Sequence, residues 1–182
     1  MAMSEKILFK DLDFINDEFV EKNSSWRVIP QPDSTYLLLT GDNLYLNEKE
    51  ERMDSVYLEM ARSWGKNSHC KRAQVGCLMV KNKSIISDGY NGSPTGFPNI
   101  CEDEKGDTLS WVLHAEANAI TKLAKSTQSS DGSTIYVTLS PCFECSKLII
   151  QSAIKRVVFT ELYRKHDSLS FLLRGGIELM KL

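Results

Sequence analysis

Ser140-Pro141-Cys142-Phe143-Glu144-Cys145 is the stretch around which this sequence is organised, and it has an upstream counterpart in His114-Ala115-Glu116. Two cysteines three positions apart share one face of a helix. With a histidine they provide three zinc ligands, which leaves the fourth coordination position free for water. Glu116 lies two residues from the histidine and is placed to move the protons of that water. The pattern therefore predicts an open metal site suited to hydrolysis.

Both halves of this pattern stand where helices are predicted to begin. Pro141 is typical of a helix start, so we expect a helix over residues 142–152, and the composition favours another over 114–125. Unpaired backbone N–H groups and the helix dipole at such positions favour a thiolate over a thiol. We expect zinc to lie between two helix N-termini at the edge of the sheet.

Two other interpretations of the cysteines need weighing. A lone Cys-x-x-Cys is most often half of a structural zinc site or a redox pair, but a redox pair needs no His-x-Glu upstream. A closed zinc site needs a fourth protein ligand, for which Cys70, Cys101 and His69 are candidates. Catalytic zinc is favoured because Glu116 would have no task in a closed site. Cys77 lies in a strand pattern and is predicted to be a buried apolar residue.

The surrounding sequence alternates between helical and extended patterns. Apolar residues between Met53 and Trp64 recur with helical spacing, and Gly65 ends the run. Further strands are predicted over 74–80, 84–88, 134–139, 156–160 and 177–180, with a last helix over 168–174. A hairpin at 81–83 followed by alternating strands and helices indicates an α/β fold with a mixed sheet covered by helices.

Residues 1–46 have a different character. The apolar residues between Phe9 and Phe19 could line a short amphipathic helix, and Ser34–Thr40 is a predicted strand. The breaker Pro30-Gln31-Pro32-Asp33 separates them. We expect an N-terminal appendage of unknown role over 1–46, packed on the main domain or on a neighbouring subunit, and one domain over 47–182.

Charge and composition restrict the partners. The chain has 182 residues with 22 Lys and Arg against 24 Asp and Glu, which gives a net charge of −2. No basic stripe stands out, so a polynucleotide is not expected, whereas a ligand with one or a few phosphates needs only two or three cations. No apolar run resembles a signal peptide or a membrane span. Five cysteines, an odd number, favour a reducing cytoplasm over a disulfide scaffold.

These motifs resemble the zinc-dependent cytidine deaminase superfamily, whose signature is His-x-Glu followed by Pro-Cys-x-x-Cys. Within it, the chain is similar to the deoxycytidylate (dCMP) deaminases, and the resemblance covers about residues 52–180. The stretches that carry it are Cys70–Gly76, Gly89–Gly92, His114–Ile120, Tyr136–Cys142 and Tyr163–Arg164. The Gly-Tyr-Asn-Gly loop and the Tyr-Arg pair narrow the resemblance to the nucleotide branch.

The resemblance implies a fold, a cofactor and a reaction. The fold would be a three-layer α/β/α sandwich with a central mixed sheet of about five strands. With one zinc ion held by His114, Cys142 and Cys145, dCMP and water would give dUMP and ammonia, and the dUMP would serve thymidylate synthesis. Glu116 would protonate N3 of the cytosine and then the departing amine, while a zinc-activated water attacks C4.

The resemblance also implies substrate contacts. Backbone groups around Ala115 would hold the pyrimidine edge, and Asn91 would contact the nucleotide. The 5′-phosphate would be bound by Arg72, Tyr163 and Arg164, because the donors of arginine match phosphate oxygens. For both arginines an ordinary surface position is the alternative, and for Asn91 a simple turn. The aromatic that stacks on the base is left open among Phe143, Tyr136 and Tyr163.

Regulation and assembly follow from the same resemblance. Such enzymes are often homo-hexamers that respond to dCTP and dTTP through the loop Gly89, Tyr90, Asn91 and Gly92, so a homo-oligomer and nucleotide effectors are expected here. Some relatives carry a second, structural zinc at cysteines corresponding to Cys70 and Cys101. The segment from Cys101 to Trp111 has no histidine. We therefore expect two free thiols and no second zinc.

Three rival functions remain. A tRNA adenosine deaminase would need a basic surface and would have no use for a terminal-phosphate site. A deaminase of riboflavin biosynthesis typically has glycines before the ligand histidine, where this chain has Trp111-Val112-Leu113. A zinc-stabilised interaction module without catalysis is the rival from another class, and it would not need the carboxylate of Glu116.

Overall fold

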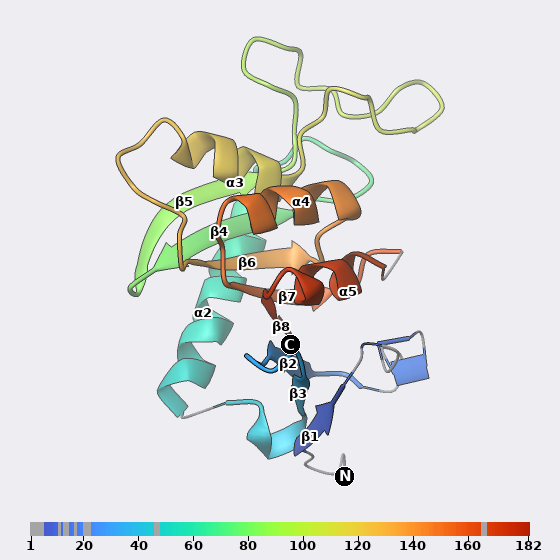
Figure 1. The fold of residues 1–182 in the computed structure, drawn as a ribbon. Helices are drawn as coiled ribbons and strands as arrows, with labels where there is room; N and C mark the ends of the chain where they lie inside the picture. Colours follow the sequence, from blue (N-terminus) through green and yellow to red (C-terminus); the bar gives the residue numbers. More distant parts are fainter. Residues whose placement is uncertain are drawn as a thin grey trace.

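The computed structural model describes residues 6–10, 12, 15–16, 18–19, 23–45, 48–164 and 167–182. Its strands form one sheet in the order β1-β3-β2-β8-β7-β6-β4-β5 (Figure 1). The strands are β1 Lys6–Phe9, β2 Trp26–Pro30, β3 Tyr36–Leu39, β4 Gly76–Lys81, β5 Ser84–Tyr90, β6 Thr134–Leu139, β7 Arg156–Glu161 and β8 Glu178–Lys181. Strands β6, β7 and β8 run parallel, and the other pairings are antiparallel. The sheet is therefore mixed, as predicted.

Helices cover both faces of this sheet. They are α2 Glu48–Gly65, α3 Ala115–Leu123, α4 Phe143–Gln151 and α5 Asp167–Arg174, with a 3-10 turn at Gly41–Asn43. Figure 1 shows α3, α4 and α5 on one side of the sheet and α2 on the other. The predicted three-layer α/β/α sandwich is confirmed.

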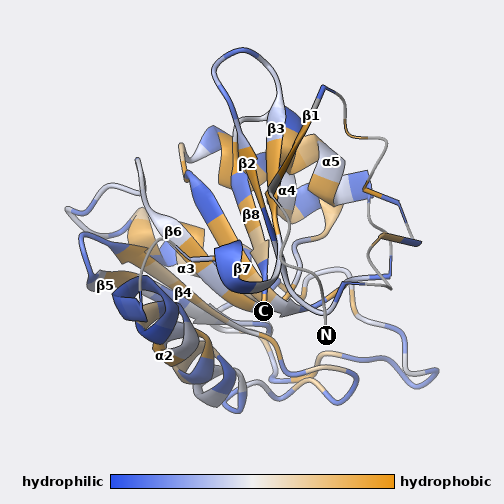
Figure 2. Cartoon of the chain, turned by 90° about the horizontal axis from the view of Figure 1, so that it is seen from below, coloured by the Kyte–Doolittle hydropathy of each residue, from blue (hydrophilic) through white to orange (hydrophobic). Residues whose placement is uncertain are grey.

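Alternation along the strands builds a core on each face, because successive strand residues point to opposite sides. In β6, Ile135 and Val137 pack into the core under α3, α4 and α5, while Tyr136 between them packs under α2. Val158 in β7 joins Tyr136 on the α2 side. Figure 2 shows the central strands largely in hydrophobic colours and α2 with many hydrophilic residues. Since both faces of the inner strands are buried, they read as apolar runs in the sequence.

The expected number of strands was wrong, because the sheet has eight strands rather than about five. Residues 76–181 contribute five, and the N-terminal segment adds β1, β3 and β2, the last of which pairs antiparallel with β8. The predicted strand at Ser34–Thr40 is confirmed as β3. The helix expected from Phe9 does not begin there, because Lys6–Phe9 is a strand, and Phe14 lies outside the described residues. Strand pairing is a long-range interaction, so short runs near the N-terminus did not reveal it.

A buried ionic network joins the N-terminal strands to the rest of the sheet. Arg27 of β2 donates to Glu178 of β8 through Nε at 2.7 Å, and Arg156 of β7 donates to the same oxygen at 2.7 Å. Arg156 also makes a bidentate contact with Asp54 of α2 at 2.9 and 2.7 Å. The hydroxyl of Tyr136 donates to Asp54 at 2.6 Å. The network thus fixes α2 and strand β2 to the same interior strands.

Asp54 should be the most sensitive member of this network, because its side chain is 2% exposed and serves both Arg156 and Tyr136. We expect Asp54→Asn to lower the free energy of unfolding by about 2 kcal/mol, since it removes the charge of a buried group that accepts three hydrogen bonds, two from Arg156 and one from Tyr136. Denaturation in urea measures this. Asp88→Asn is the control, because Asp88 pairs with the exposed Lys122 and should cost less than about 1 kcal/mol. An equal cost for both variants would contradict the prediction.

Candidate active site

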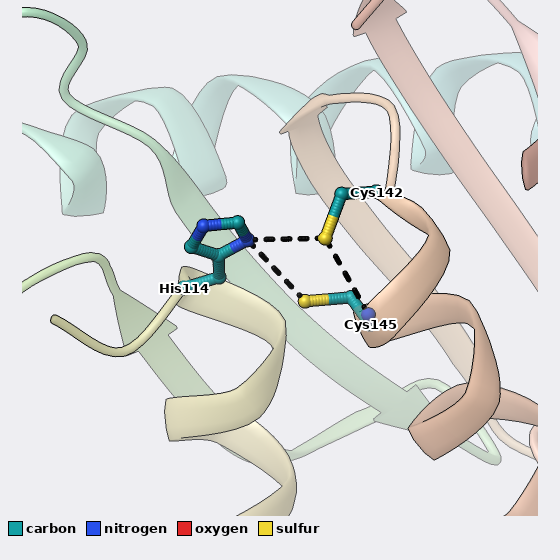
Figure 3. A group of neighbouring side chains, drawn as sticks. All are labelled: His114, Cys142 and Cys145. Carbon is teal, nitrogen blue, oxygen red and sulfur yellow. Dashed lines mark hydrogen bonds between the residues drawn. The ribbon is translucent and has the colours of Figure 1, made fainter. Parts of the chain in front are cut away.

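Three side chains that could hold a metal converge where α3 and α4 begin (Figure 3). The Nδ1 atom of His114 lies 3.3 Å from Sγ of Cys142 and 3.5 Å from Sγ of Cys145. Within the described part of the chain, this is the group of His, Cys and acidic side chains close enough to share one ion. The structure therefore brings together the three ligands that the sequence predicted.

The chain places these ligands by helix capping. His114 is the N-cap of α3 and Cys142 the N-cap of α4, both with extended backbone. The Cys142 sulfur accepts a hydrogen bond from the backbone N–H of Cys145, which lies in the first helical turn. The ligands thus lie at two helix N-termini, as predicted. Strand β6 leads into α4 and is an interior strand, so the site is at the carboxyl end of that strand and not on an edge strand.

Hydrogen bonds between the side chains shift the pKa values of the two thiols in opposite directions. Hydrogen bonds from the side chain of Cys145 and from His114 lower the pKa of Cys142 to about 4. The pKa of Cys145 is raised, first by its hydrogen bond to Cys142 and then by burial. Two neighbouring thiolates repel one another, and a zinc ion between them would relieve that repulsion. Two thiolates and one imidazole are a donor set that zinc prefers, so the residues fit this metal.

Glu116 lies beside these ligands in the first turn of α3 and is 3% exposed. Burial raises the pKa of Glu116 to about 7, against the opposing effects of the helix N–H groups and of His114. A buried carboxyl group next to a metal site can pass a proton between water and a substrate.

A cavity of about 270 Å³ opens in front of this cluster. It is slightly smaller than typical small-molecule sites, which start at about 300 Å³. Eight of the residues predicted to bind the metal or the substrate, or to take part in catalysis, line this cavity: Arg72, Asn91, His114, Ala115, Glu116, Cys142, Tyr163 and Arg164. Cys145 is buried and lies outside this lining. Residues far apart in the sequence therefore share one cavity.

The side chain of Asn91 is occupied by the backbone. Its Oδ1 accepts from the N–H of Val75 at 2.8 Å, and its Nδ2 donates to the carbonyl of Ala73 at 2.8 Å. These bonds fix the segment that follows Arg72. Asn91 also lines the cavity. Its side chain therefore stabilises the cavity wall, and its contact with a nucleotide stays a prediction.

Several lining residues escaped the sequence analysis. Ser140 is one: it follows β6, it is buried, and its hydroxyl accepts from the backbone N–H of Tyr163 at 2.8 Å. Its place just before Pro141 could have drawn attention to it. Glu102 and Thr108 also line the cavity, where both contact Arg72, and they come from a loop with no motif. Only the folded chain shows that this loop reaches the site.

Close packing constrains the loop Gly89–Gly92. A Cβ on Gly89 would lie 2.3 Å from the carbonyl oxygen of Ala115, so glycine is required where β5 crosses the start of α3. Gly92 exchanges two backbone hydrogen bonds with Leu113, directly before His114. Tyr90 is 37% exposed. The loop therefore supports the metal site, and its predicted contact with effectors stays a prediction.

The three candidates for base stacking have different surroundings. Tyr163 lines the cavity. Phe143 packs its ring on Phe171 with centroids 4.6 Å apart. Tyr136 lies in the core under α2 and bonds to Asp54, away from the cavity, because its position in β6 points it to the other face. Tyr163 is the one that remains a candidate on this geometry.

The expectation of two free thiols at Cys70 and Cys101 was wrong, since they form a disulfide. The sequence could not show this, because the pairing depends on two loops meeting over 31 positions. Cys77 is buried, as predicted. His69 is exposed, and His166 lies outside the described residues.

In the part of the chain that the structure describes, no helix has the length and apolar character needed to span a membrane.

Comparisons with known proteins agree with this site. Residues 49–161 match the family described as "Cytidine and deoxycytidylate deaminase zinc-binding region". ComE operon protein 2 of Bacillus subtilis (strain 168) is 43% identical over 103 residues, which cover 54% of this chain and 54% of that protein. The chain thus matches about half of the length of that relative. The deoxycytidylate deaminase of Mycobacterium phage D29 is 35% identical over 120 residues, 58% of this chain and 92% of that protein.

A solved structure is similar over most of the chain. The dCMP deaminase from the cyanophage S-TIM5, in complex with dCMP and dUMP, is 42% identical, with a TM-score of 0.71. The match covers 76% of this chain and 100% of that chain.

Proposed function

Because this chain belongs to the cytidine and deoxycytidylate deaminase family, we propose that it deaminates dCMP to dUMP and ammonia with the help of one zinc ion. One observation carries the proposal: two members of the candidate metal cluster, His114 and Cys142, line a single cavity together with Glu116, Arg72 and Arg164. The similar cyanophage enzyme was solved with dCMP and dUMP. The dUMP formed would supply thymidylate synthesis.

His114, Cys142 and Cys145 are the residues that would hold the metal. When bound, zinc supplies a Lewis acid that makes water a strong nucleophile near neutral pH. The chain provides what surrounds this chemistry. Glu116, a buried residue of the cavity lining, takes one proton from water and delivers it to N3 of the pyrimidine; it then takes the second proton from the hydroxyl group now on C4 and delivers it to the departing amine. The buried backbone of Ala115 holds the pyrimidine edge.

The phosphate would be bound at the open end of the cavity. Arg72 and Arg164 are exposed cations that line it, together with Tyr163. A guanidinium group matches phosphate oxygens with paired donors. Because the chain as a whole is slightly acidic, these arginines supply a local rather than a global attraction for the anion.

A substrate panel tests the proposal. Purified protein with zinc is given dCMP, CMP, dCTP, deoxycytidine and tRNA, and ammonia release is followed. We expect dCMP to be the best substrate by kcat/KM. Turnover of tRNA without turnover of dCMP would support the tRNA deaminase instead, and no turnover by a zinc-loaded protein would support a zinc-stabilised interaction module.

Arg164 should contribute to binding of the phosphate and not to the chemical step. We expect Arg164→Ala to raise the KM for dCMP about 10-fold with little change in kcat, since a contact equal in the ground and transition states affects KM alone. Deoxycytidine, which lacks the phosphate, should be unaffected. Arg174→Ala is the control, because Arg174 is an exposed cation at the end of α5 and outside the cavity. A similar rise in the KM for deoxycytidine would contradict the assignment of Arg164 to phosphate binding.

Other features remain proposals on the same basis. We infer a homo-oligomer, with a hexamer as the expected size, and binding of dCTP and dTTP at Gly89, Tyr90, Asn91 and Gly92. A cytoplasmic location is also proposed. Strands β1, β2 and β3 of the segment 1–46 extend the sheet, and we propose that this segment supports the deaminase domain over 47–182 rather than the reaction itself.

A further inference from the structure

A loop that lines the cavity holds the segment that carries Arg72. Residues 101–108, which we call the clasp, close on themselves through a bridge between Glu102 and Thr108 and a hydrogen bond from Asp103 to Asp107 at 2.9 Å. Cys101 is joined to Cys70 by the disulfide. The clasp is therefore a compact loop fixed covalently two residues before Arg72.

Polar contacts continue the same attachment. One carboxylate oxygen of Glu102 accepts from the backbone N–H groups of Lys71 and Arg72, at 2.9 and 3.1 Å. The hydroxyl of Thr108 lies 3.4 Å from Nη1 of Arg72. The disulfide, the carboxylate and the hydroxyl thus act on three consecutive residues, 70–72. In addition, Cys70, Arg72, Glu102 and Thr108 all line the cavity of the proposed active site.

The segment 70–72 has little regular structure to hold it otherwise. It lies in the connection between α2 and β4, where Lys71 and Arg72 form a bend and Cys70 belongs to no helix, strand or turn. Lys71 and Arg72 are exposed, whereas Cys70 and Cys101 are 5% and 1% exposed. A disulfide restricts the conformations of the two loops that it joins. Its loss would leave the guanidinium of Arg72 dependent on weaker, solvent-exposed hydrogen bonds.

We propose that the Cys70–Cys101 disulfide and Glu102 position Arg72 for the phosphate of the substrate, so that nucleotide binding depends on the redox state of this disulfide. The proposal rests on the proposed function, since it concerns the phosphate end of the same cavity. Glu102 and the two cysteines are positioning residues, because they act through Arg72 and do not contact the reacting atoms. The intact disulfide holds the site tight for dCMP, and its reduction loosens the site.

Reduction by a trialkylphosphine provides a balanced test reaction. The phosphine attacks one sulfur and the S–S bond breaks, after which water hydrolyses the phosphorus–sulfur adduct. The phosphine is oxidised to a phosphine oxide that takes the oxygen of the water. Both sulfurs are reduced to thiols and take its two hydrogens. A phosphine is preferred to a dithiol, because dithiols also bind zinc through sulfur.

A competing interpretation is that the two cysteines bind a second zinc. In the described residues they do not belong to a group of three or more metal-binding side chains. Zinc analysis of the purified protein decides this: the proposal requires one zinc per chain and three free thiols in denaturant, with five after reduction. Two zinc ions per chain, or five thiols before reduction, would overturn it.

Kinetics test the positioning role itself. In the zinc-loaded protein, we expect phosphine reduction to raise the KM for dCMP about 10-fold with kcat changed less than about 2-fold, and kcat/KM for deoxycytidine to stay the same. A Cys70→Ser/Cys101→Ser double variant should show the higher KM and no longer respond to phosphine. A purely structural role would instead lower kcat and affect both substrates alike, which would sink the proposal.

Substitution of Glu102 provides an independent test of the positioning role. Glu102→Ala should raise the KM for dCMP between about 3- and 10-fold with the disulfide intact, because it removes two charge-assisted hydrogen bonds at the surface. Glu104→Ala is the matched control: Glu104 is an exposed acid of the same loop and does not line the cavity. An equal change in the KM for dCMP in both variants would show that only the loss of a negative charge matters, and would contradict the positioning role of Glu102.

The outcomes separate this inference from the proposed function. If the oxidised protein does not deaminate dCMP, the proposed function fails, and calorimetric titration with dCMP then tests the clasp through the Kd. Weaker dCMP binding on reduction would still support the clasp. If dCMP is deaminated with the same KM before and after reduction, the clasp proposal fails and the proposed function stands.

Discussion

Glu116→Gln should lower deaminase activity by at least about 10²-fold while the protein stays folded and zinc-loaded. Glutamine has nearly the same shape but cannot carry a proton between water and the pyrimidine, and proton transfer of this kind contributes about 10²- to 10⁴-fold. The loss should appear in kcat, since the carboxylate acts in the chemical step. Ammonia release from dCMP measures it, and zinc content is determined on the same sample.

The neighbouring helix offers a matched control. Glu144 stands in the first turn of α4, as Glu116 does in α3, but its side chain is 78% exposed and pairs with Lys147. Glu144→Gln should leave activity within about 2-fold. Zinc loss or unfolding of the Glu116 variant would show that this carboxylate is structural, and the proton-transfer role would then be wrong.

Cys145→Ser should release the metal and abolish turnover. A serine hydroxyl stays protonated near neutral pH and is a poor zinc ligand, so two protein ligands would remain instead of three. We expect less than about 0.1 zinc per chain after dialysis and a fall in activity of at least about 10³-fold, because both the metal and its activated water are lost. Zinc analysis and ammonia release on the same preparation measure the two effects.

Cys77→Ala is the control for this variant. Cys77 is also a buried cysteine, but it lies in β4 and is not part of the metal group. It should keep a full complement of zinc and most of its activity, with a modest cost in stability from the buried substitution. Full zinc occupancy in Cys145→Ser would contradict the assignment of Cys145 as a ligand.

The metal cluster could be predicted from the sequence for a physical reason. His114, Cys142 and Cys145 lie at helix N-termini. Such positions leave local signals in the sequence, namely capping residues, a preceding proline and a spacing of three residues. The inner strands β6 and β7 were equally readable, because strands buried on both faces form apolar runs. Local patterns therefore determined the central sheet and the core of the site.

The residues proposed to bind the phosphate were predicted from the family resemblance. The other residues that surround them in the cavity were not predicted. Arg72 and Arg164 have no local pattern that separates a phosphate ligand from a surface charge. The structure added that both line the cavity, and that Glu102 and Ser140 do so beside them. It also showed that Tyr136, one candidate for base stacking, points to the opposite face of the sheet.

The sequence by itself predicted the members of the metal cluster, a proton-transfer role for Glu116, and the central strands and helices, because each of these is marked by a local motif or an apolar run. The tertiary structure alone decided that residues 26–28 pair with β8, that Arg27 and Asp54 belong to one buried network, and that Cys70 and Cys101 form a disulfide. These contacts join segments that are distant along the chain, and the free energy that selects them comes from the packing of the whole fold.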